Sequence, residues 1–340
     1  MNFPALENKI YLDTARSGLM YDDLLKWRKE HENDFLINGS QFRANHESFL
    51  DNVRLQINNF INSPDSNTCL VNNFSTGLAL LLYHIKSSSK ILIINEDYPS
   101  ITNKIIYSGF EFCSIDNTLD LENQILKGIK KFTPDVFIFS IVQYIDGLLI
   151  DLDFIKKIKT KYPDILIVAD GTQFFGTKSF DFKSSGIDIV ISSGYKWMLG
   201  GYGNGFISFN KIIPLHHFKK DLNSTNLLEI FEQGHLDTLS FGSLGFSLNQ
   251  ISSYGMKKIE NQINLLSSYA KEILTKKKLL SDKIVRRKHH SSIFNIKGDH
   301  NLFVKLKKNK IICSKRGDGL RISFNFYNKK TEIDLLNKIL

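Results

Sequence analysis

Short apolar runs alternate with amphipathic stretches over the first two thirds of the chain. Seven of these runs predict strands: TCLVNN (68–73), KILIIN (90–95), EFCSI (111–115), DVFIFSIV (135–142), ILIVAD (165–170), IDIVISSG (187–194) and GFISFN (205–210). Between them, STGLALLLYHIKS and DLDFIKKIKTKY carry apolar residues at helical spacing. Apolar strands separated by helices predict an α/β fold, with a mostly parallel seven-stranded sheet sandwiched by helices.

The pattern changes after about residue 214. A long helical pattern covers 243–279, and the short runs SIFNIK, LFVKL and GLRISFNF predict strands before a closing helix, KKTEIDLLNKIL. We therefore predict a smaller α+β lobe made from residues 1–14 and 215–340, beside a large domain of residues 15–214.

Composition narrows the class of protein. Of the 340 residues, 42% are hydrophobic and 23% are charged, as in an ordinary globular protein. No apolar run approaches the roughly 20 residues that cross a bilayer, and the N-terminus lacks the basic and apolar regions of a signal peptide. The three cysteines, Cys69, Cys113 and Cys313, have neither zinc-site nor disulfide-framework spacing. We predict a cytoplasmic protein without a metal site and without membrane contact.

The net charge of +9 raises the question of nucleic acid. Much of the excess comes from late lysine-rich runs, KKK (276–278), RRKHH (286–290) and KLKKNK (305–310), which no aromatic residues interleave. Because no nucleic-acid-binding signature accompanies them, we predict a solvated basic face and no nucleic-acid partner. The same charge favours the approach of anionic small molecules.

One lysine stands apart from these runs. Lys196 lies between Tyr195 and Trp197 in SGYKWMLGGYGNG (193–205), directly after a predicted buried strand. Asp170 ends another predicted strand, and ligands collect beyond the carboxyl ends of such strands. A lysine amine together with a carboxylate is what pyridoxal phosphate requires, for a Schiff base and for a protonated pyridine nitrogen. By itself, Asp170 is equally compatible with a helix cap.

A phosphate cradle is predicted in NNFSTGLALLL (72–82). A strand gives way there to Ser75, Thr76 and Gly77, where a helix begins, so free backbone N–H groups and the helix dipole favour an anion. An ordinary helix cap without a ligand is the alternative reading. Ser192 and Ser193, just before the lysine, are candidates for further phosphate contacts.

The order of these segments resembles the class V aminotransferase superfamily, which has the type I pyridoxal-phosphate fold and includes cysteine desulfurases, kynureninases and isopenicillin N epimerase-like proteins. The similarity extends nearly from end to end. It is carried by YLDTARSG (11–18), NFSTGLALL, NEDYPS (95–100), SIVQYIDGLLIDL, VADGTQ, SGYKWMLGGYGNGF and ICSKRGDGLRISFNFYNKKTEIDLL.

The resemblance implies a role for individual residues. Lys196 would hold the cofactor as a Schiff base and move protons at the substrate Cα, with Asp170 on the pyridine nitrogen. Arg321 would bind the substrate carboxylate in a bidentate pair. The other implied cofactor contacts are Gln173 near the phenolic oxygen, Ser75, Thr76 and Ser193 on the phosphate with Tyr195 nearby, Tyr98 stacked on the ring, Gln143 facing cofactor or substrate, and either His235 or Thr238 reaching the phosphate across a homodimer interface.

The reaction stays open within limits. The resemblance implies an amino-acid substrate, an external aldimine and Cα deprotonation, which favours an aminotransferase or lyase; an amino-acid epimerase and desulfurase-like sulfur transfer are the alternatives. Cys313, in the apolar run KIICSKR, is predicted to be a buried structural thiol, which disfavours a desulfurase. A non-catalytic regulatory protein that keeps the fold is the alternative of another class, disfavoured because Lys196, Asp170 and Arg321 occur together.

Overall fold

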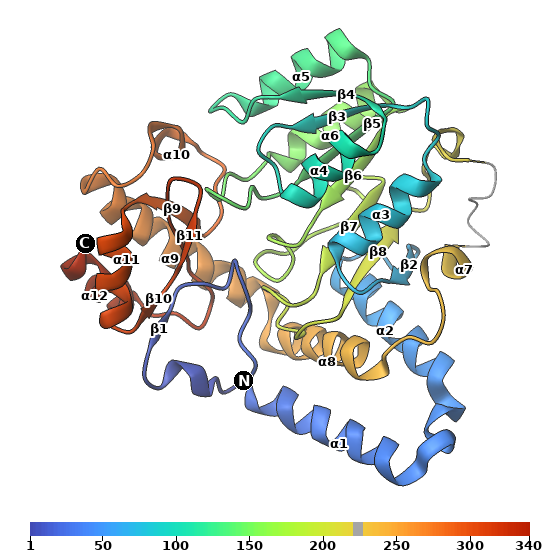
Figure 1. The fold of residues 1–340 in the computed structure, drawn as a ribbon, viewed down its shortest axis with the longest axis horizontal. Helices are drawn as coiled ribbons and strands as arrows, with labels where there is room; N and C mark the ends of the chain where they lie inside the picture. The colour runs from blue at the N-terminus through green and yellow to red at the C-terminus, as the bar shows by residue number, and fades with distance from the viewer. Residues whose placement is uncertain (220–226) are drawn as a thin grey trace.

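A computed structural model describes residues 1–219 and 227–340 (Figure 1). At its centre is a seven-stranded sheet with the order β2-β8-β7-β6-β5-β3-β4, in which β8 runs antiparallel to both neighbours and the other pairs are parallel. The predicted α/β class and all seven predicted strands are confirmed. The strands are β2 (Asn67–Leu70), β3 (Lys90–Ile94), β4 (Glu111–Ile115), β5 (Val136–Ser140), β6 (Leu166–Asp170), β7 (Ile189–Ser193) and β8 (Gly205–Phe209).

Helices cover both faces of this sheet because successive residues of a strand point to opposite sides. In β5, Phe137 and Phe139 pack in one core with α2, α5, α6 and α8, whereas Val136 and Ile138 pack in another with α3, α4 and α7. The helices of the first face are α2 (His46–Phe60), α5 (Leu121–Phe132), α6 (Leu152–Lys161) and α8 (Thr238–Tyr254). Those of the second are α3 (Phe74–His84), α4 (Pro99–Tyr107) and α7 (Leu227–Phe231), with the 3-10 turn η3 (Leu215–His217) before α7.

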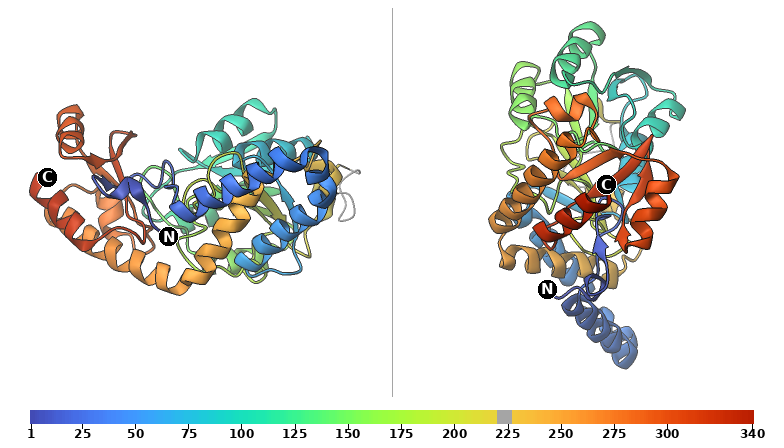
Figure 2. Two further views of the ribbon diagram at one scale, coloured as in Figure 1. Left: turned by 90° about the horizontal axis from the view of Figure 1, so that it is seen from below. Right: turned by 90° about the vertical axis from the view of Figure 1, so that its left-hand side faces the viewer.

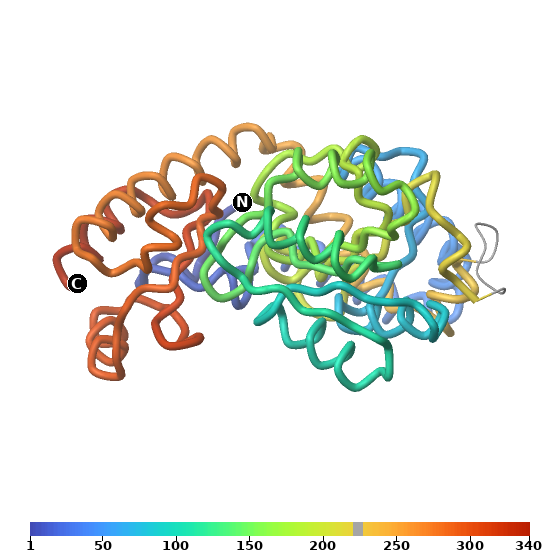
Figure 3. The backbone as a smooth tube through the Cα atoms, turned by 90° about the horizontal axis from the view of Figure 1, so that it is seen from above, coloured from blue at the N-terminus to red at the C-terminus, as the bar shows by residue number. Residues whose placement is uncertain are grey.

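A smaller α+β lobe lies beside the large one (Figures 2 and 3). Its antiparallel sheet has the order β11-β12-β9. The elements are α9 (Met256–Lys276), α10 (Asp282–Arg286), β9 (Ile293–Lys297), α11 (His300–Lys308), β10 (Ile311–Ile312), β11 (Ser314–Arg316), β12 (Gly319–Ser323) and α12 (Lys330–Ile339). Helix α8 lies beyond residue 214 but packs against α2 of the large lobe, and α9 of the smaller lobe follows it directly. The predicted boundary at residue 214 therefore stays a prediction.

Two sequence expectations for this lobe are wrong. The run LFVKL (302–306) lies in α11, not in a strand, because Asp299 accepts a hydrogen bond from the Leu302 backbone N–H (2.9 Å) and so caps a helix. The long helical pattern at 243–279 is two helices, separated at Gly255, whose φ of 101° is one that glycine adopts readily.

The N-terminal segment joins the two lobes. After the 3-10 turn η1 (Pro4–Leu6), β1 (Ile10–Tyr11) pairs in parallel with β10 of the smaller lobe. The chain then passes to the large lobe through α1 (Asp22–Asn38) and η2 (Gly39–Asn45). Helix α1 buries only Leu24 and extends away from the body of the molecule (Figure 2). In the part of the chain that is described, no helix combines the length and the apolar character that a membrane span requires.

Candidate active site

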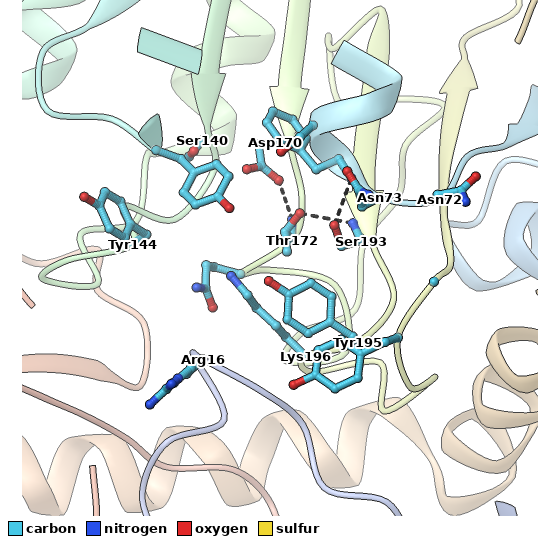
Figure 4. Close-up of a pocket in the computed structure, with 16 residues that line it drawn as sticks. Arg16, Asn72, Asn73, Ser140, Tyr144, Asp170, Thr172, Ser193, Tyr195 and Lys196 are labelled. Carbon is cyan, nitrogen blue, oxygen red and sulfur yellow. Dashed lines mark hydrogen bonds between the residues drawn. The ribbon is translucent and has the colours of Figure 1, made fainter. Parts of the chain in front are cut away.

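A cavity of about 580 Å³ opens at the carboxyl ends of β5, β6 and β7 (Figure 4). Ser140, Asp170 and Ser193 are the last residues of these three strands and all line it. The full lining is Arg16, Asn72, Asn73, Phe74, Ser75, Tyr98, Ser140, Tyr144, Asp170, Thr172, Gln173, Ser193, Tyr195, Lys196, Tyr202 and Gly203. This is the edge of a parallel sheet at which ligands bind, as the sequence predicted.

Lys196 is buried in this cavity, with 6% of its surface exposed. Burial lowers the pKa of its amine to about 8; the Asp170 carboxylate raises it in opposition, and the charges of Arg321 and Arg316 lower it further. Its Nζ lies 5.7 Å from the ring centre of Tyr98 and 5.5 Å from that of Tyr195. An amine with this pKa has an appreciable neutral fraction near neutral pH, so it can act as a nucleophile or a base.

The backbone around the lysine is held from two sides. Asn204 Nδ2 donates to the carbonyl oxygens of Gly200 (2.8 Å) and Ser240 (2.9 Å). The N–H of Gly18, in the N-terminal segment, donates to the Tyr195 carbonyl (2.8 Å). A Cβ on Gly18 would lie 2.0 Å from the Lys196 carbonyl oxygen, so this close approach requires glycine.

Asp170 faces the same cavity from the end of β6. Burial raises the pKa of its carboxyl to about 6, while hydrogen bonds from Thr172 and the charge of Lys196 lower it in opposition. The Thr172 backbone N–H donates to Asp170 Oδ1 (2.8 Å), and Thr172 Oγ1 accepts from the N–H of Ser193 (3.1 Å). Thr172 therefore ties the ends of β6 and β7 together and fixes the carboxylate in place.

The N-terminus of α3, where the sequence predicts a phosphate cradle, lies at one end of the cavity. Asn73 caps this helix, because its Oδ1 accepts from the Thr76 N–H (3.0 Å). The Phe74 N–H donates to Ser193 Oγ (2.8 Å), and the Ser75 and Ser100 hydroxyls are 2.6 Å apart. Asn73, Phe74, Ser75 and Ser193 line the cavity. The Ser75 and Ser193 hydroxyls and the positive end of the helix dipole suit a phosphate here, although the Phe74 and Thr76 N–H groups already donate to Ser193 and Asn73. Thr76 is exposed and does not line the cavity.

Three further predicted cofactor contacts, Tyr98, Tyr195 and Gln173, line the cavity. The Tyr98 ring centre is 5.6 Å from that of Tyr144. The amide of Gln173 is fixed: Nε2 donates to the Ala15 carbonyl (2.8 Å), and Oε1 accepts from Trp197 (2.8 Å).

Gln143 does not line the cavity. It is buried, and its Nε2 lies 3.3 Å from Asp97 Oδ2. The next residue, Tyr144, faces the cavity in its place.

Arg321, in β12, is 2% exposed and does not itself line the cavity, but it contacts Tyr144, which does. Its Nη1 donates to the Tyr144 carbonyl (2.8 Å), and its Nη2 is 3.9 Å from Asp13 Oδ1. Burial lowers the pKa of this guanidinium to about 10, although the negative charge of Asp13 acts to raise it. Within the described residues its Nε has no hydrogen-bond partner. A buried cation with an unused donor suits a carboxylate ligand.

His235 and Thr238 lie outside the cavity. They line a separate cleft of about 410 Å³ beside the N-terminus of α8, where the His235 ring contacts the Arg43 guanidinium and Thr238 Oγ1 is 2.9 Å from His31 Nε2. Neither side chain reaches the α3 N-terminus of its own chain, so the predicted contact across a dimer interface stays a prediction.

Several lining residues were missed from the sequence. They are Arg16, Asn72, Asn73, Phe74, Ser140, Tyr144, Thr172, Tyr202 and Gly203. A signal was available for three of them: Asn73 precedes the first helical turn of NNFSTG, Thr172 is part of VADGTQ, and Ser140 is a polar residue inside the predicted strand DVFIFSIV (135–142). Arg16 belongs to a segment that the pattern of strands does not place near the lysine.

These residues fit pyridoxal phosphate. One cavity contains a buried amine, a buried acid, a helix N-terminus with hydroxyls and an aromatic ring beside the amine. Residues 10–336 match the family model described as aminotransferase class-V. The chain belongs to the class-V aminotransferase family. It is therefore an enzyme that depends on pyridoxal phosphate, as the lysine and aspartate segments predicted.

The chain has low sequence identity to the known proteins that it matches, but its fold is very similar to those of solved structures. The chain is 24% identical to a probable cysteine desulfurase of Ureaplasma parvum, over 80% of this chain and 75% of the relative. It is 28% identical to the cysteine desulfurase SufS of Plasmodium falciparum, over 54% of this chain and 40% of the relative.

Among solved structures, a complex of the cystine C-S lyase C-DES with its reaction product cysteine persulfide superposes with a TM-score of 0.87 at 17% identity, covering 99% of this chain and 98% of that chain. A NifS-like protein of Rickettsia africae gives a TM-score of 0.81 at 16% identity, covering 97% and 98%. These likenesses confirm the predicted type I fold.

Proposed function

We propose that this class-V enzyme is a lyase that breaks the Cβ–S bond of cysteine or of an S-substituted cysteine, releasing the sulfur to solvent. The overall products are pyruvate, ammonia and a thiol, or sulfide when the substrate is cysteine itself. The single observation that carries the proposal is the absence of a cysteine in the cavity, where a desulfurase would need one to accept the sulfur.

The three cysteines of the chain are all among the described residues, and none lines the cavity. Cys69 is fully buried within strand β2 of the sheet, and Cys113 lies on the edge strand β4. Cys313 lies between β10 and β11, where burial raises the pKa of its thiol to about 12. A buried thiol that stays protonated is a poor acceptor of sulfur. The two relatives named as cysteine desulfurases and the neighbour named as a cystine C-S lyase support a substrate of the cysteine class.

The proposed reaction gives each of the following residues a defined role. Bound pyridoxal phosphate supplies an electron sink for the negative charge that develops at Cα. Asp170 would hold the ring nitrogen, the α3 N-terminus with Ser75 and Ser193 would hold the phosphate, and Arg321 would orient the substrate carboxylate. Lys196 would hold the cofactor and then take the Cα proton on Nζ. The Cβ–S bond breaks with its electron pair on sulfur, Lys196 returns the proton to that sulfur, and water completes the conversion to pyruvate and ammonia.

Two further expectations from the family resemblance belong to this proposal. We propose a cytoplasmic homodimer in which His235 or Thr238 of one protomer contacts the phosphate bound by the other. The exposed cleft around His235, outside its own chain's cavity, supports that arrangement. Sedimentation that finds a fully active monomer would contradict it.

The experiment compares products of the wild type and of Cys313→Ser, each loaded with pyridoxal phosphate and supplied with L-cysteine or an S-substituted cysteine. We expect pyruvate and sulfide or thiol in equal amounts, with both proteins turning over at rates within about twofold of each other. Cys113→Ser is the matched control, since Cys113 lies on the edge strand β4.

Three results contradict the proposal. Alanine together with a persulfide on Cys313, lost in Cys313→Ser, would identify a desulfurase. An oxo acid that retains the sulfur would identify an aminotransferase, and a racemised amino acid an epimerase.

A further inference from the structure

Arg16 lies in the cavity at the end away from the phosphate cradle. Figure 4 shows it on the N-terminal segment, well separated from Asn73 and Ser193. Its side chain is exposed, and across residues 1–219 and 227–340 it makes no ion pair with a carboxylate. The large net positive charge of the chain does not explain a cation inside a cavity. An arginine that lines a substrate cavity without an acidic partner is available to an anionic group of a ligand.

The backbone of Arg16 is fixed, although its side chain is free. The N–H groups of Arg16 and Ser17 donate to the Asp13 carbonyl (2.9 and 3.1 Å), and the Ala15 N–H donates to Ser323 Oγ (3.1 Å). Two residues further on, Gly18 is bonded to the lysine loop. The guanidinium therefore starts from a defined point near the reacting amine, and only its own rotamers remain to be ordered by a ligand.

Positive charge is in excess around this end of the cavity. Burial raises the pKa of Asp13, while a hydrogen bond from Ser314 and the charges of Arg321, Arg16 and Arg316 lower it, so three arginines surround one carboxylate. Arg321 is the nearest of them, at 3.9 Å. Arg316 donates to a backbone carbonyl, that of Lys315 (2.9 Å).

The α-carboxylate of an amino acid supplies only one negative charge here. Paired with Arg321, it leaves Arg16 without a counter-charge, and the cofactor phosphate is at the opposite end of the cavity. We propose that the substrate carries a second anionic group on its side chain, most simply a carboxylate, and that Arg16 binds this group. The role of Arg16 assumes an amino-acid substrate at Lys196, and the substrate class named next rests on the proposed function. The preferred substrate is then an acidic S-substituted cysteine.

The test uses two substrates that differ in one functional group. S-carboxymethyl-L-cysteine and S-carbamoylmethyl-L-cysteine have the same length and leaving atom, but only the first carries a second negative charge. For the wild-type holoenzyme we expect kcat/KM to favour the acid by about three- to tenfold, the range for a charge-assisted contact that stays partly in solvent.

In Arg16→Gln the ratio of kcat/KM for the acid to that for the amide should fall to about one. Arg16→Lys should retain part of the preference for the acid because the charge remains. Arg286→Gln is the matched control: it removes the same charge from an exposed position in α10, outside the cavity, and should leave the preference unchanged. Calorimetry with glutarate and its monoamide, neither of which has an amino group to react, gives a second readout on the same four proteins. Arg16→Gln should weaken the binding of glutarate only.

The outcomes separate this inference from the proposed function. Elimination from both substrates at equal kcat/KM would overturn the role of Arg16 and leave the lyase intact. A preference for the acid that Arg16→Gln does not change would also overturn it. A loss of equal size for acid and amide in Arg16→Gln would overturn it as well, since that pattern indicates a general defect. Acid preference with transamination products would sustain the role of Arg16 and overturn the lyase.

Discussion

The two ends of the active-site cavity are built in opposite ways. At the cofactor end, Asp170, Thr172 and Ser193 end neighbouring parallel strands, and hydrogen bonds of 2.8 and 3.1 Å join them to one another. At the proposed substrate end, Arg16 is exposed and lines the cavity, and Arg321 is buried and contacts the lining residue Tyr144. The two arginines come from segments about 300 residues apart in the chain, and the Nε of Arg321 has no partner among the described residues. At the cofactor end, Asp170, Thr172 and Ser193 therefore satisfy one another, whereas among the described residues the Nε of Arg321 keeps a donor for a ligand.

This difference indicates how one fold can keep its cofactor while its substrate varies. Residues at the ends of parallel strands are positioned by the hydrogen-bond ladder of the sheet, so their spacing is stable. Side chains from an N-terminal loop and a second lobe depend on how those parts dock, and changing one of them does not disturb the sheet. Substitutions at the two ends should therefore have effects of different kind and size.

The largest effect is expected at the cofactor end, from Lys196→Ala. The variant loses both the amine that attaches pyridoxal phosphate and the base for Cα, and the proton transfer alone is worth about 10²–10⁴-fold in rate. Absorption spectra should lack the visible band of lysine-bound cofactor, and turnover should fall by at least that factor. Lys183→Ala, at an exposed lysine that pairs with Asp65, is the control. An unchanged spectrum in Lys196→Ala would remove this residue from the site.

An intermediate effect is expected at the substrate end, from Arg321→Gln. Removing a buried charged partner of a carboxylate should raise KM by about ten- to hundredfold, while the cofactor spectrum stays that of the wild type. The measurement is steady-state kinetics together with the spectrum of each variant. Arg321→Lys should recover only part of the loss, because an ammonium cannot make the bidentate contact. Wild-type affinity in Arg321→Gln would show that the carboxylate binds elsewhere.

The smallest effect is expected from a change of pH, which alters the protonation of Lys196. With the pKa of Lys196 lowered to about 8, its neutral, nucleophilic form increases as pH rises through that value. The rate of cofactor uptake by the apoprotein should therefore rise about tenfold between about pH 7 and 9 and then level off.

Asp170→Asn removes the charge that raises this pKa, so its profile should shift to lower pH. N-acetyl-lysine amide with the same cofactor is the reference for an ordinary amine. A wild-type midpoint equal to that of the reference would contradict the lowered pKa of the buried lysine.

The sequence predicted most of the sheet and of the cofactor end because both depend on local pattern. An apolar run followed by a polar residue places Asp170 and Lys196 at one edge once the strands are parallel. Other features depend on information that a local pattern does not carry. The run LFVKL contains enough apolar residues for a strand, but it forms a helix because Asp299 caps the N-terminus of α11. Arg16 is placed by the docking of its loop on Ser323 and Tyr195, contacts that no periodicity along the chain encodes.

The pairing of β1 with β10 has a consequence for biosynthesis. Ile10 and Tyr11 leave the ribosome about 300 residues before their partners Ile311 and Ile312. Every strand of the central sheet is complete about a hundred residues earlier than that. During translation the nascent protein therefore acquires its lysine and acid first, and the loop bearing Arg16 must wait, unanchored at one end, until β10 has been synthesised.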